Sequence, residues 1–280
     1  MKPPRFDYTA PTALPEALAA LGGGALPLAG GQSLVLELHY RRQRPSALVD
    51  LNGIAELDRI TDDGDALRVG ALARHRAFET PVAGGPLGRL LADAAAHIAH
   101  PPVRNRGTML GSLAWANPAS EWPAVAVALD AELTLASAAG TRTVRAGEFF
   151  QGPHATVRRP DELLVEARFP ALRGGAAFAE HRRTHASFAQ IAVVAALRLD
   201  GGVITEARLA LAGAADRPLR VRAAEQHLVG RAADAFERAG ELAAEAADPL
   251  PEPHGSAEHK RRVAAVLVRR TLQDAYEDGS

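Results

Sequence analysis

The spacing of apolar residues along the chain predicts a mixture of helices and strands. Apolar positions that recur every three or four residues predict a helix over residues 11–21, with Thr12 as its N-cap, and a second helix over 88–99. The stripe expected to be buried on the second helix consists of Leu90, Leu91, Ala94, Ala95 and Ile98. Short apolar runs between turn residues predict strands over 25–29, 47–51, 66–69, 132–136, 142–145 and 162–169.

The pattern changes after residues 171–175, Ala-Leu-Arg-Gly-Gly, which form the best candidate for a domain boundary. Two longer strands are predicted beyond it, joined by a turn at Asp200-Gly201-Gly202, and helices follow them. The predicted ranges are 190–199 and 203–211 for the strands, 223–229, 232–247 and 256–275 for the helices, and 249–253 for a Pro-rich link. Strands followed by helices in one block indicate a separate α+β unit.

Composition limits the classes of function. A length of 280 residues is typical of about two domains. The net charge of −1 provides no global basic field, so nucleic acid or an anionic membrane would need a local patch. The chain has no cysteine, which excludes disulfides, thiolate nucleophiles and an iron–sulfur cluster on this chain, and it fits a reducing cytoplasm. We find no targeting or membrane-spanning segment, and therefore expect a cytoplasmic protein.

Two glycine-containing segments are candidates for binding phosphate. Residues 29–33, Ala-Gly-Gly-Gln-Ser, directly follow a predicted strand, and two glycines allow consecutive N–H groups to face one anion. Residues 100–112 are rich in proline and glycine and predict a shaped loop, in which Gly107-Thr108 and Gly111-Ser112 repeat the same chemistry. Each loop could also be an ordinary turn. Arg104 and Arg106 beside the second loop either bind phosphate or brace the loop.

These loops stand within a longer series of residues that resembles one known family. The matching positions are 29–34, Pro45, 48–51, 69–71, 97–99, 103–108, 111–114, Ala116, Pro118, Ala119, Glu121, 148–150, 199–202, 255–258, Arg261 and Arg262. They follow the family order over nearly the whole chain. The sequence is identified as a member of the FAD-binding medium subunits of molybdenum hydroxylases, such as carbon monoxide dehydrogenase and xanthine dehydrogenase.

The resemblance implies an α+β fold. A two-part FAD-binding domain of the p-cresol methylhydroxylase/vanillyl-alcohol oxidase (PCMH/VAO) type would occupy residues 1–172, with subdomains of about 1–55 and 56–172. A smaller α+β domain of the carbon monoxide dehydrogenase flavoprotein type would occupy 176–280. It also implies non-covalent FAD and no metal on this chain.

The resemblance assigns cofactor contacts position by position. Residues matching the two pyrophosphate loops are Ala29, Gly30, Gly31, Gln32 and Ser33 in the first and Thr108, Leu110, Gly111 and Ser112 in the second. Glu121 matches an acidic residue that accepts hydrogen bonds from FAD hydroxyls, and Asn117 belongs to the same cofactor-side segment. Apolar positions along the cofactor are Leu34, Ile98 and Leu164, and Phe188 matches an aromatic residue against the flavin ring.

The resemblance implies that the chain relays electrons within a larger enzyme. The molybdenum cofactor would lie on a large partner subunit and 2Fe–2S clusters on a small one, and electrons would pass through FAD on this chain to an external acceptor. The primary substrate would bind the molybdenum subunit, so this sequence does not name it. Neither nucleic acid nor membrane insertion is implied.

Several cofactor-side positions depart from the family pattern. They are His39, Leu110, Trp115, Asn117, Glu180 and Ser187. Leu110 replaces a glycine and would be penalised if that position needs a positive φ. These departures are either neutral drift or a sign of altered redox tuning or weaker FAD binding. Two alternatives therefore stay open: a stand-alone flavoenzyme acting on a small molecule, and a flavin-free relative serving as a binding module.

The other titratable groups give weaker signals. The pairs His97/His100 and His181/His185 have helical spacing, but a metal site is not expected at either. No carboxylate completes a motif around the first pair, and Arg182 and Arg183 would repel a cation from the second. The last predicted helix carries the basic residues Lys260, Arg261, Arg262, Arg269 and Arg270. This basic face is interpreted as a solvated surface or, alternatively, as a docking surface for partner subunits.

Overall fold

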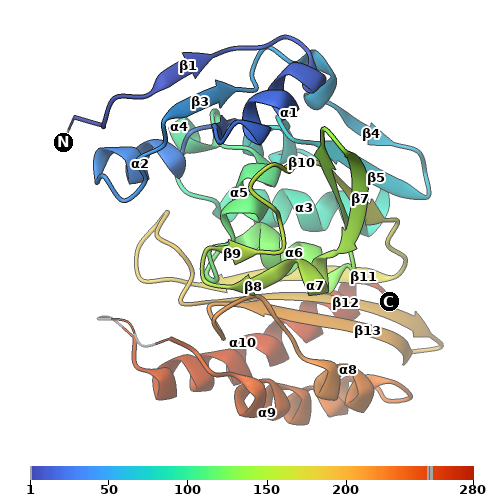
Figure 1. Cartoon of the computed structure of the whole chain (residues 1–280). Helices are drawn as coiled ribbons and strands as arrows, with labels where there is room; N and C mark the ends of the chain where they lie inside the picture. The colour runs from blue at the N-terminus through green and yellow to red at the C-terminus, as the bar shows by residue number, and fades with distance from the viewer. Residues whose placement is uncertain (1, 251, 253–254) are drawn as a thin grey trace.

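The computed structural model describes residues 2–250, 252 and 255–280. Part of the predicted Pro-rich link, at 251 and 253, lies outside the described residues. Figure 1 shows the N-terminal segments at one end, a helical middle layer, and a C-terminal sheet covered by a final layer of helices. Among the described residues, no helix is long and apolar enough to cross a membrane.

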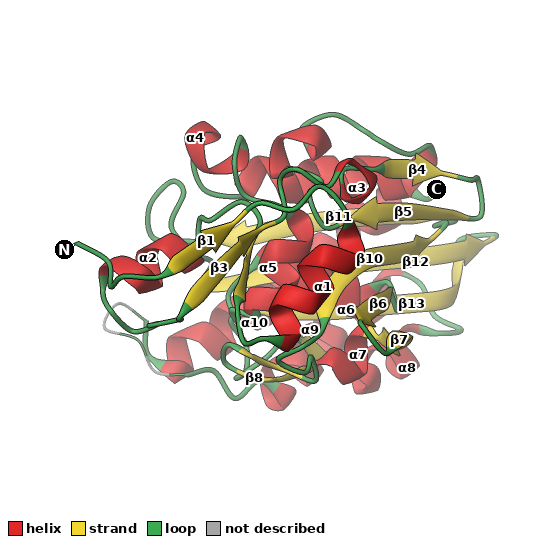
Figure 2. Ribbon diagram, turned by 45° about the horizontal axis from the view of Figure 1, so that its top comes forward, coloured by secondary structure: helices red, strands yellow, loops and turns green. Residues whose placement is uncertain are grey.

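The N-terminal layer is a small parallel sheet in the order β1 (Asp7–Thr9), β3 (Ala47–Asp50), β2 (Leu26–Leu28). Figure 2 shows β1 and β3 side by side, with helix α1 (Leu14–Gly22) next to them. The predicted cap at Thr12 is wrong: Ala13 is the N-cap and no side chain caps the helix. Proline is tolerated only in the first helical turn, so Pro15 places the start at Leu14. A short helix α2 (Leu34–His39) follows the first glycine loop.

A five-stranded antiparallel sheet forms the other side of the N-terminal part of the chain. Its order is β4 (Ile60–Asp62), β5 (Ala66–Gly70), β10 (Leu163–Pro170), β6 (Glu132–Ser137), β7 (Gly140–Arg145). The strands predicted over 132–136 and 142–145 are confirmed, and they pair as a hairpin with Ser137 opposite Gly140. Smaller elements complete this region: η1 (Ala55–Leu57), η2 (His75–Phe78), α7 (Ala146–Phe149), β8 (Phe150–Gly152) and β9 (Ala155–Thr156).

Three helices fill the middle of the molecule: α3 (Gly85–His97), α5 (Met109–Trp115) and α6 (Glu121–Ala128). The predicted stripe on α3 is confirmed, because all five of its residues are buried. The prediction of one shaped loop over 100–112 is wrong, since α4 (Pro101–Arg104) and the start of α5 lie there. The prolines occupy the first turn of α4, where their missing N–H groups are not needed.

The C-terminal sheet has the order β11 (Gly175–His181), β12 (Ile191–Asp200), β13 (Val203–Ala212), β14 (Leu219–Arg220). One face packs against α8 (Arg222–Leu228), η3 (Ala233–Ala235), α9 (Phe236–Ala246) and α10 (Ala257–Asp278). The other face packs against the middle helices: Ala192 and Val194 join that core, whereas Ile191 and Val193 join the outer one. Burial on both faces explains the continuous apolar run in β12.

The basic last helix is less solvated than the sequence indicates. Lys260 on α10 is only 1% exposed, and its Nζ lies 3.0 Å from Oε1 of Glu252. Arg262 pairs with Glu258 on the same helix and Arg269 with Glu237 on α9. The interpretation of the basic residues as a solvated face is therefore wrong for Lys260, because its side chain is buried.

Candidate functional site

The two glycine loops lie in direct contact. A Cβ built on Gly30 would overlap the carbonyl oxygen of Arg106 and would lie 2.7 Å from the Cα of Gly107. Only a residue without a side chain allows the two backbones to approach so closely. Arg74 fastens the contact by donating to the carbonyl of Arg106 and to the side-chain oxygen of Asn52. Two segments more than 70 residues apart in sequence are thus held side by side, so that both can contact one ligand.

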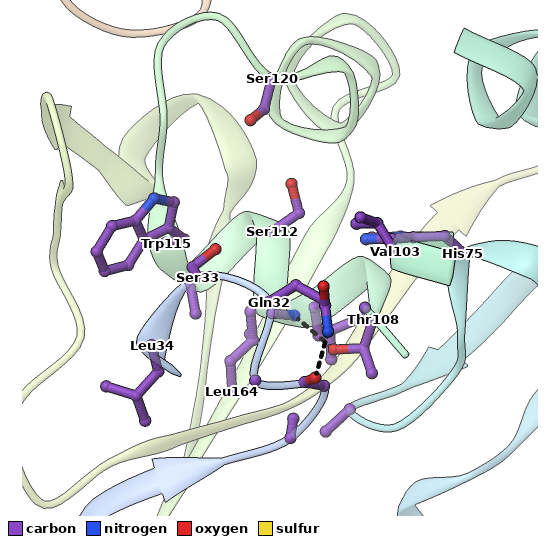
Figure 3. Close-up of a pocket in the computed structure, with 18 of the residues that line it drawn as sticks. Gln32, Ser33, Leu34, His75, Val103, Thr108, Ser112, Trp115, Ser120 and Leu164 are labelled. Carbon is purple, nitrogen blue, oxygen red and sulfur yellow. Dashed lines mark hydrogen bonds between the residues drawn. The ribbon is translucent and has the colours of Figure 1, made fainter. Parts of the chain in front are cut away.

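The first loop presents free amide donors. Gly31 has a φ of +73°, and Ser33 follows in the right-handed region, a combination that turns successive N–H groups toward one point. Among the described residues, the backbone N–H groups of Gly31, Gln32 and Ser33 donate to no protein acceptor, whereas the side-chain amide of Gln32 donates to the carbonyl of Gly30 at 3.4 Å. Figure 3 shows the hydroxyls of Ser33, Ser112 and Ser120 pointing into the space between the loops. This donor set suits an anion such as phosphate.

The second loop is organised by Thr108. It is the N-cap of α5, and its Oγ1 accepts a hydrogen bond of 3.0 Å from the amide of Gly111. A Cβ on Gly111 would lie 2.7 Å from the same oxygen, so this position also favours glycine. The backbone of the second loop is therefore fixed by its own side chain before any ligand binds.

A cavity of about 430 Å³ lies between the loops, and it takes in most of the residues that the sequence singled out. Its wall includes Ala29, Gly30, Gly31, Gln32, Ser33, Leu34, Ile98, Thr108, Leu110, Gly111, Ser112, Glu121, Leu164 and Phe188. Asn117 does not line the cavity; its Oδ1 accepts from the amide of Ala119 and shapes the turn before α6. Phe188 stands at the rim with 59% of its surface exposed.

Leu110 does not obstruct the loop. It lies within α5, not at a positive φ, and its side chain is buried in the core and 2% exposed. The concern that a glycine is required at this position is therefore wrong for this chain, because helical backbone accepts leucine without strain. The main argument for a flavin-free relative disappears with it.

His75 is a cavity residue that the sequence analysis missed. It is buried, and its Nδ1 accepts a hydrogen bond of 2.9 Å from Nε1–H of Trp122. Since the indole can only donate, the imidazole proton must sit on Nε2. Burial, aided by Arg104 and Arg74, lowers the pKa of His75 to about 4, so the ring is neutral at pH 7. Figure 3 shows His75 on the side of Val103, across the cavity from Trp115.

His75 thus offers one neutral N–H donor to an occupant. Its Nε2 has no protein partner among the described residues. No motif around His75 in the sequence predicts that it lies beside the second loop. Trp122, forty-seven positions later, holds it there through this hydrogen bond.

Two further aromatic groups form the opposite wall. The rings of Trp115 and His154 are 4.7 Å apart at their centroids, and Nδ1–H of His154 donates to the carbonyl of Trp115 at 3.1 Å. Both residues line the cavity. His154 has a positive φ of 56° in the turn between β8 and β9, and no motif in the sequence indicates that this turn folds back onto α5.

The two arginines beside the second loop have different surroundings. Arg104 donates to Glu79 at 2.5 Å and to the carbonyls of Ile98 and Ala99 at 2.9 and 3.1 Å. Arg104 therefore braces the loop, which is the second of the two roles that the sequence left open. Arg106 instead lines an adjoining hollow of about 340 Å³, together with His39 and Asp50. This hollow and the main cavity both border the first loop, since they share Ala29, Gly30, Gly31 and Gln32 as lining residues.

Two buried carboxyl groups lie at the edge of the cavity. Glu121 begins α6 and lines the wall, and burial raises its pKa to about 7. Glu180 on β11 has a fully buried side chain behind that wall, and burial together with the charge of Glu121 raises its pKa to about 8. Ser187 lines the cavity as well, and its hydroxyl donates to the carbonyl of Thr184 at 2.9 Å.

Family models cover nearly all of the chain. Residues 4–172 match the FAD binding domain in molybdopterin dehydrogenase, and residues 176–275 match the CO dehydrogenase flavoprotein C-terminal domain. The chain is 38% identical to the 6-hydroxypseudooxynicotine dehydrogenase complex subunit alpha of Paenarthrobacter nicotinovorans, over 98% of this chain and 96% of the relative. It is 34% identical to the carbon monoxide dehydrogenase medium chain of Hydrogenophaga pseudoflava, over 99% of each.

Solved structures agree over the same length. A structure of carbon monoxide dehydrogenase from Hydrogenophaga pseudoflava that lacks the Mo-pyranopterin moiety matches with a TM-score of 0.95 and 35% identity, over 100% of both chains. Quinoline 2-oxidoreductase from Pseudomonas putida 86 matches with a TM-score of 0.94 and 34% identity, over 100% of this chain and 99% of the other. The expected two-domain α+β architecture is confirmed. The chain belongs to the family of FAD-binding medium subunits of molybdenum hydroxylase-type dehydrogenases, and is an oxidoreductase subunit.

Proposed function

We propose that this chain binds FAD non-covalently in the cavity between the two glycine loops. The observation that carries this proposal is the contact between the loops, because the first loop, with its free backbone N–H groups at residues 31–33, and Ser112 of the second loop then line the same cavity. Donors on both sides of one cleft suit the two adjacent phosphates of a dinucleotide. Gly30 fits this arrangement as well, because a side chain there would push the first loop away from the backbone of Arg106 and Gly107 and so open the site.

The remaining walls suit the rest of such a cofactor. Leu34, Ile98 and Leu164 supply apolar surface, and Phe188 offers an aromatic face at the rim. Glu121 is placed to accept hydrogen bonds from hydroxyl groups, and His75 donates through Nε2. FAD, when bound, supplies the two-electron chemistry, and the protein's part is binding, orientation and electrostatics.

We propose further that the chain relays electrons from an iron–sulfur subunit to an external acceptor. The molybdenum cofactor and the 2Fe–2S clusters would be on partner subunits, since this chain has no cysteine to bind a cluster. Relatives named as medium or alpha subunits of dehydrogenase complexes support this division. The domain boundaries we propose are 1–172, divided near residue 55, and 176–280.

The phosphate-binding role can be tested with the two serines of the loops. Removing both hydroxyls, with Ser33→Ala and Ser112→Ala together, deletes two hydrogen bonds to the phosphates at little cost to packing. We expect the Kd for FAD to rise by roughly 10- to 100-fold, at about 1 kcal/mol per bond. Ser137→Ala, in the distant β6–β7 hairpin, serves as the matched control. Fluorescence titration with FAD measures all three proteins, and an unchanged Kd in the double variant would contradict the assignment.

A further inference from the structure

The side chain of Glu180 is buried by the register of its strand. Alternate residues of β11, Ala176 and Phe178, join the core shared with α3 and α6, and Glu180 continues the same face. Its cross-strand partner Ala192 belongs to that apolar layer too. A carboxyl group therefore lies inside the contact between the two parts of the chain, with none of its side chain exposed.

Glu180 is not hydrogen-bonded there. Neither Oε1 nor Oε2 has a hydrogen-bond partner among the described residues. Arg182 comes to 3.7 Å from Oε1, and the same Nη1 donates to the carbonyl of His97 at 2.6 Å. An ionised carboxylate that is buried and accepts no hydrogen bond is strongly disfavoured. The surroundings therefore favour the protonated form of Glu180.

Glu121 is the second member of the pair. It is 5% exposed, and unlike Glu180 it reaches the cavity wall. Burial first, and then the charge of Glu121, raise the pKa of Glu180, while Arg182 acts on both groups in the opposite direction. Two acids coupled in this way in a dry environment do not both ionise near neutrality, so the pair carries one proton.

The charged and titratable groups around Glu121 and Glu180 are consistent with a single negative charge on this pair. Arg182 follows β11 and provides the positive charge, with Nδ1 of His185 3.4 Å from its Nη2. From α3, His97 packs its ring against Phe178 and is held by a 2.8 Å hydrogen bond to the carbonyl of Asp93. On the opposite face of β11, the ring of His181 contacts that of His259 on α10.

We propose that Glu121 and Glu180 hold one proton between them near neutral pH and form a proton-binding site at the edge of the cavity, which takes up a second proton when negative charge is added to the bound cofactor. The proposal rests on the proposed function, because FAD is the cofactor that would gain this charge on reduction. An external reductant supplies the electrons to the cofactor. The solvent supplies the proton, which forms an O–H bond on the remaining carboxylate, and no protein bond breaks.

The midpoint potential of the FAD-loaded chain, measured against pH with dithionite and mediator dyes, tests the uptake. Between about pH 7 and pH 8, the slope for the wild type should correspond to about one proton more per two electrons than that for Glu180→Gln. Glutamine keeps the shape of the neutral acid and cannot titrate. Glu166→Gln removes a partly exposed carboxylate on β10 and should follow the wild type. Equal slopes in wild type and Glu180→Gln would overturn the proposal.

A measurement on the cofactor-free chain separates this proposal from the proposed function. Infrared difference spectra between about pH 6 and pH 9 should show a protonated carboxyl band that titrates in the wild type and is clearly smaller in Glu180→Gln, where Glu121 alone remains to titrate. Absence of this band in the wild type would overturn the shared proton even if FAD binds. If the band is present but the wild type binds no FAD, the proposed function fails, and with it the charge-linked uptake.

Discussion

Single residues at this site are tuned by burial more than by ion pairs. His75 is held neutral by its enclosed position and oriented by Trp122, and Glu180 is held protonated by the absence of hydrogen-bond partners among the described residues. Neither property can be read from the residue type, because both depend on neighbours brought in from distant segments. The consequences of each can be measured separately.

Replacing His75 should weaken FAD binding without altering its stoichiometry. In His75→Ala, the lost Nε2–H donor should raise the Kd for FAD by roughly tenfold, the value of one hydrogen bond. Trp122→Phe keeps the imidazole but frees its tautomer, and should give a smaller loss. Affinity in the wild type should not change between about pH 6 and pH 8 through His75, since its pKa of about 4 leaves it neutral throughout. An unaltered Kd in His75→Ala would argue against contact with the cofactor.

Glu180 should make the stability of the fold depend on pH. Its pKa in the folded chain is raised to about 8 from 4.5, so its contribution to stability is fully present below the lower value and is lost as pH rises toward the higher one. Glu180→Gln has no such loss. The Tm of the variant should therefore exceed that of the wild type by roughly 5 °C more at pH 9 than at pH 5. Thermal unfolding monitored by circular dichroism decides this, and a Tm difference that is constant with pH would contradict it.

At the level of elements, the site depends on the two glycine loops, which the helices and strands around them hold in contact. Gly30→Ala should force the first loop away from the carbonyl of Arg106, lowering both FAD affinity and stability. We expect at least a tenfold rise in Kd and a loss of roughly 1–3 kcal/mol on unfolding. Gly147→Ala, in α7 with open space around it, is the control and should be neutral or slightly stabilising. Equal behaviour of the two variants in titration and urea unfolding would refute the role of the contact.

The strongly patterned elements could be predicted from the sequence, and the unpatterned ones could not. The apolar stripe of α3 predicts its helix because one face of that helix is buried. The turn at Asp200-Gly201-Gly202 predicts the pairing of the two strands on either side of it. Helix α6 is buried all round and so has no polar face to reveal its period. The loops were recognisable by composition, but their contact rests on the Gly30 backbone meeting Arg106, and the position of His75 rests on Trp122.

For the molecule as a whole, the C-terminal sheet is not an independent half. Its inner face, including Phe178, Ala192 and Val194, belongs to the same core as the middle helices. Arg220 ties the parts further, donating to the carbonyl of Val127 at 3.1 Å and pairing with Asp130 and Glu225 at 2.5 and 2.6 Å.

This shared core predicts a single unfolding transition. Both tryptophans, Trp115 and Trp122, belong to the N-terminal part, so their fluorescence reports on that part alone, whereas circular dichroism reports on all elements. The two signals should coincide during urea unfolding, because neither part keeps its core without the other. Arg220→Met should shift both midpoints equally to lower urea. Two separate transitions would show that the parts fold independently.

The central claim is that the contacting glycine loops hold FAD, and the absorption spectrum of the purified chain tests it most directly. The chain is incubated with FAD, passed through gel filtration, and assayed for flavin per polypeptide. We predict close to one FAD per chain in the wild type, and retention well below that in Gly30→Ala. A wild-type chain that is folded by circular dichroism yet elutes without flavin would contradict the account.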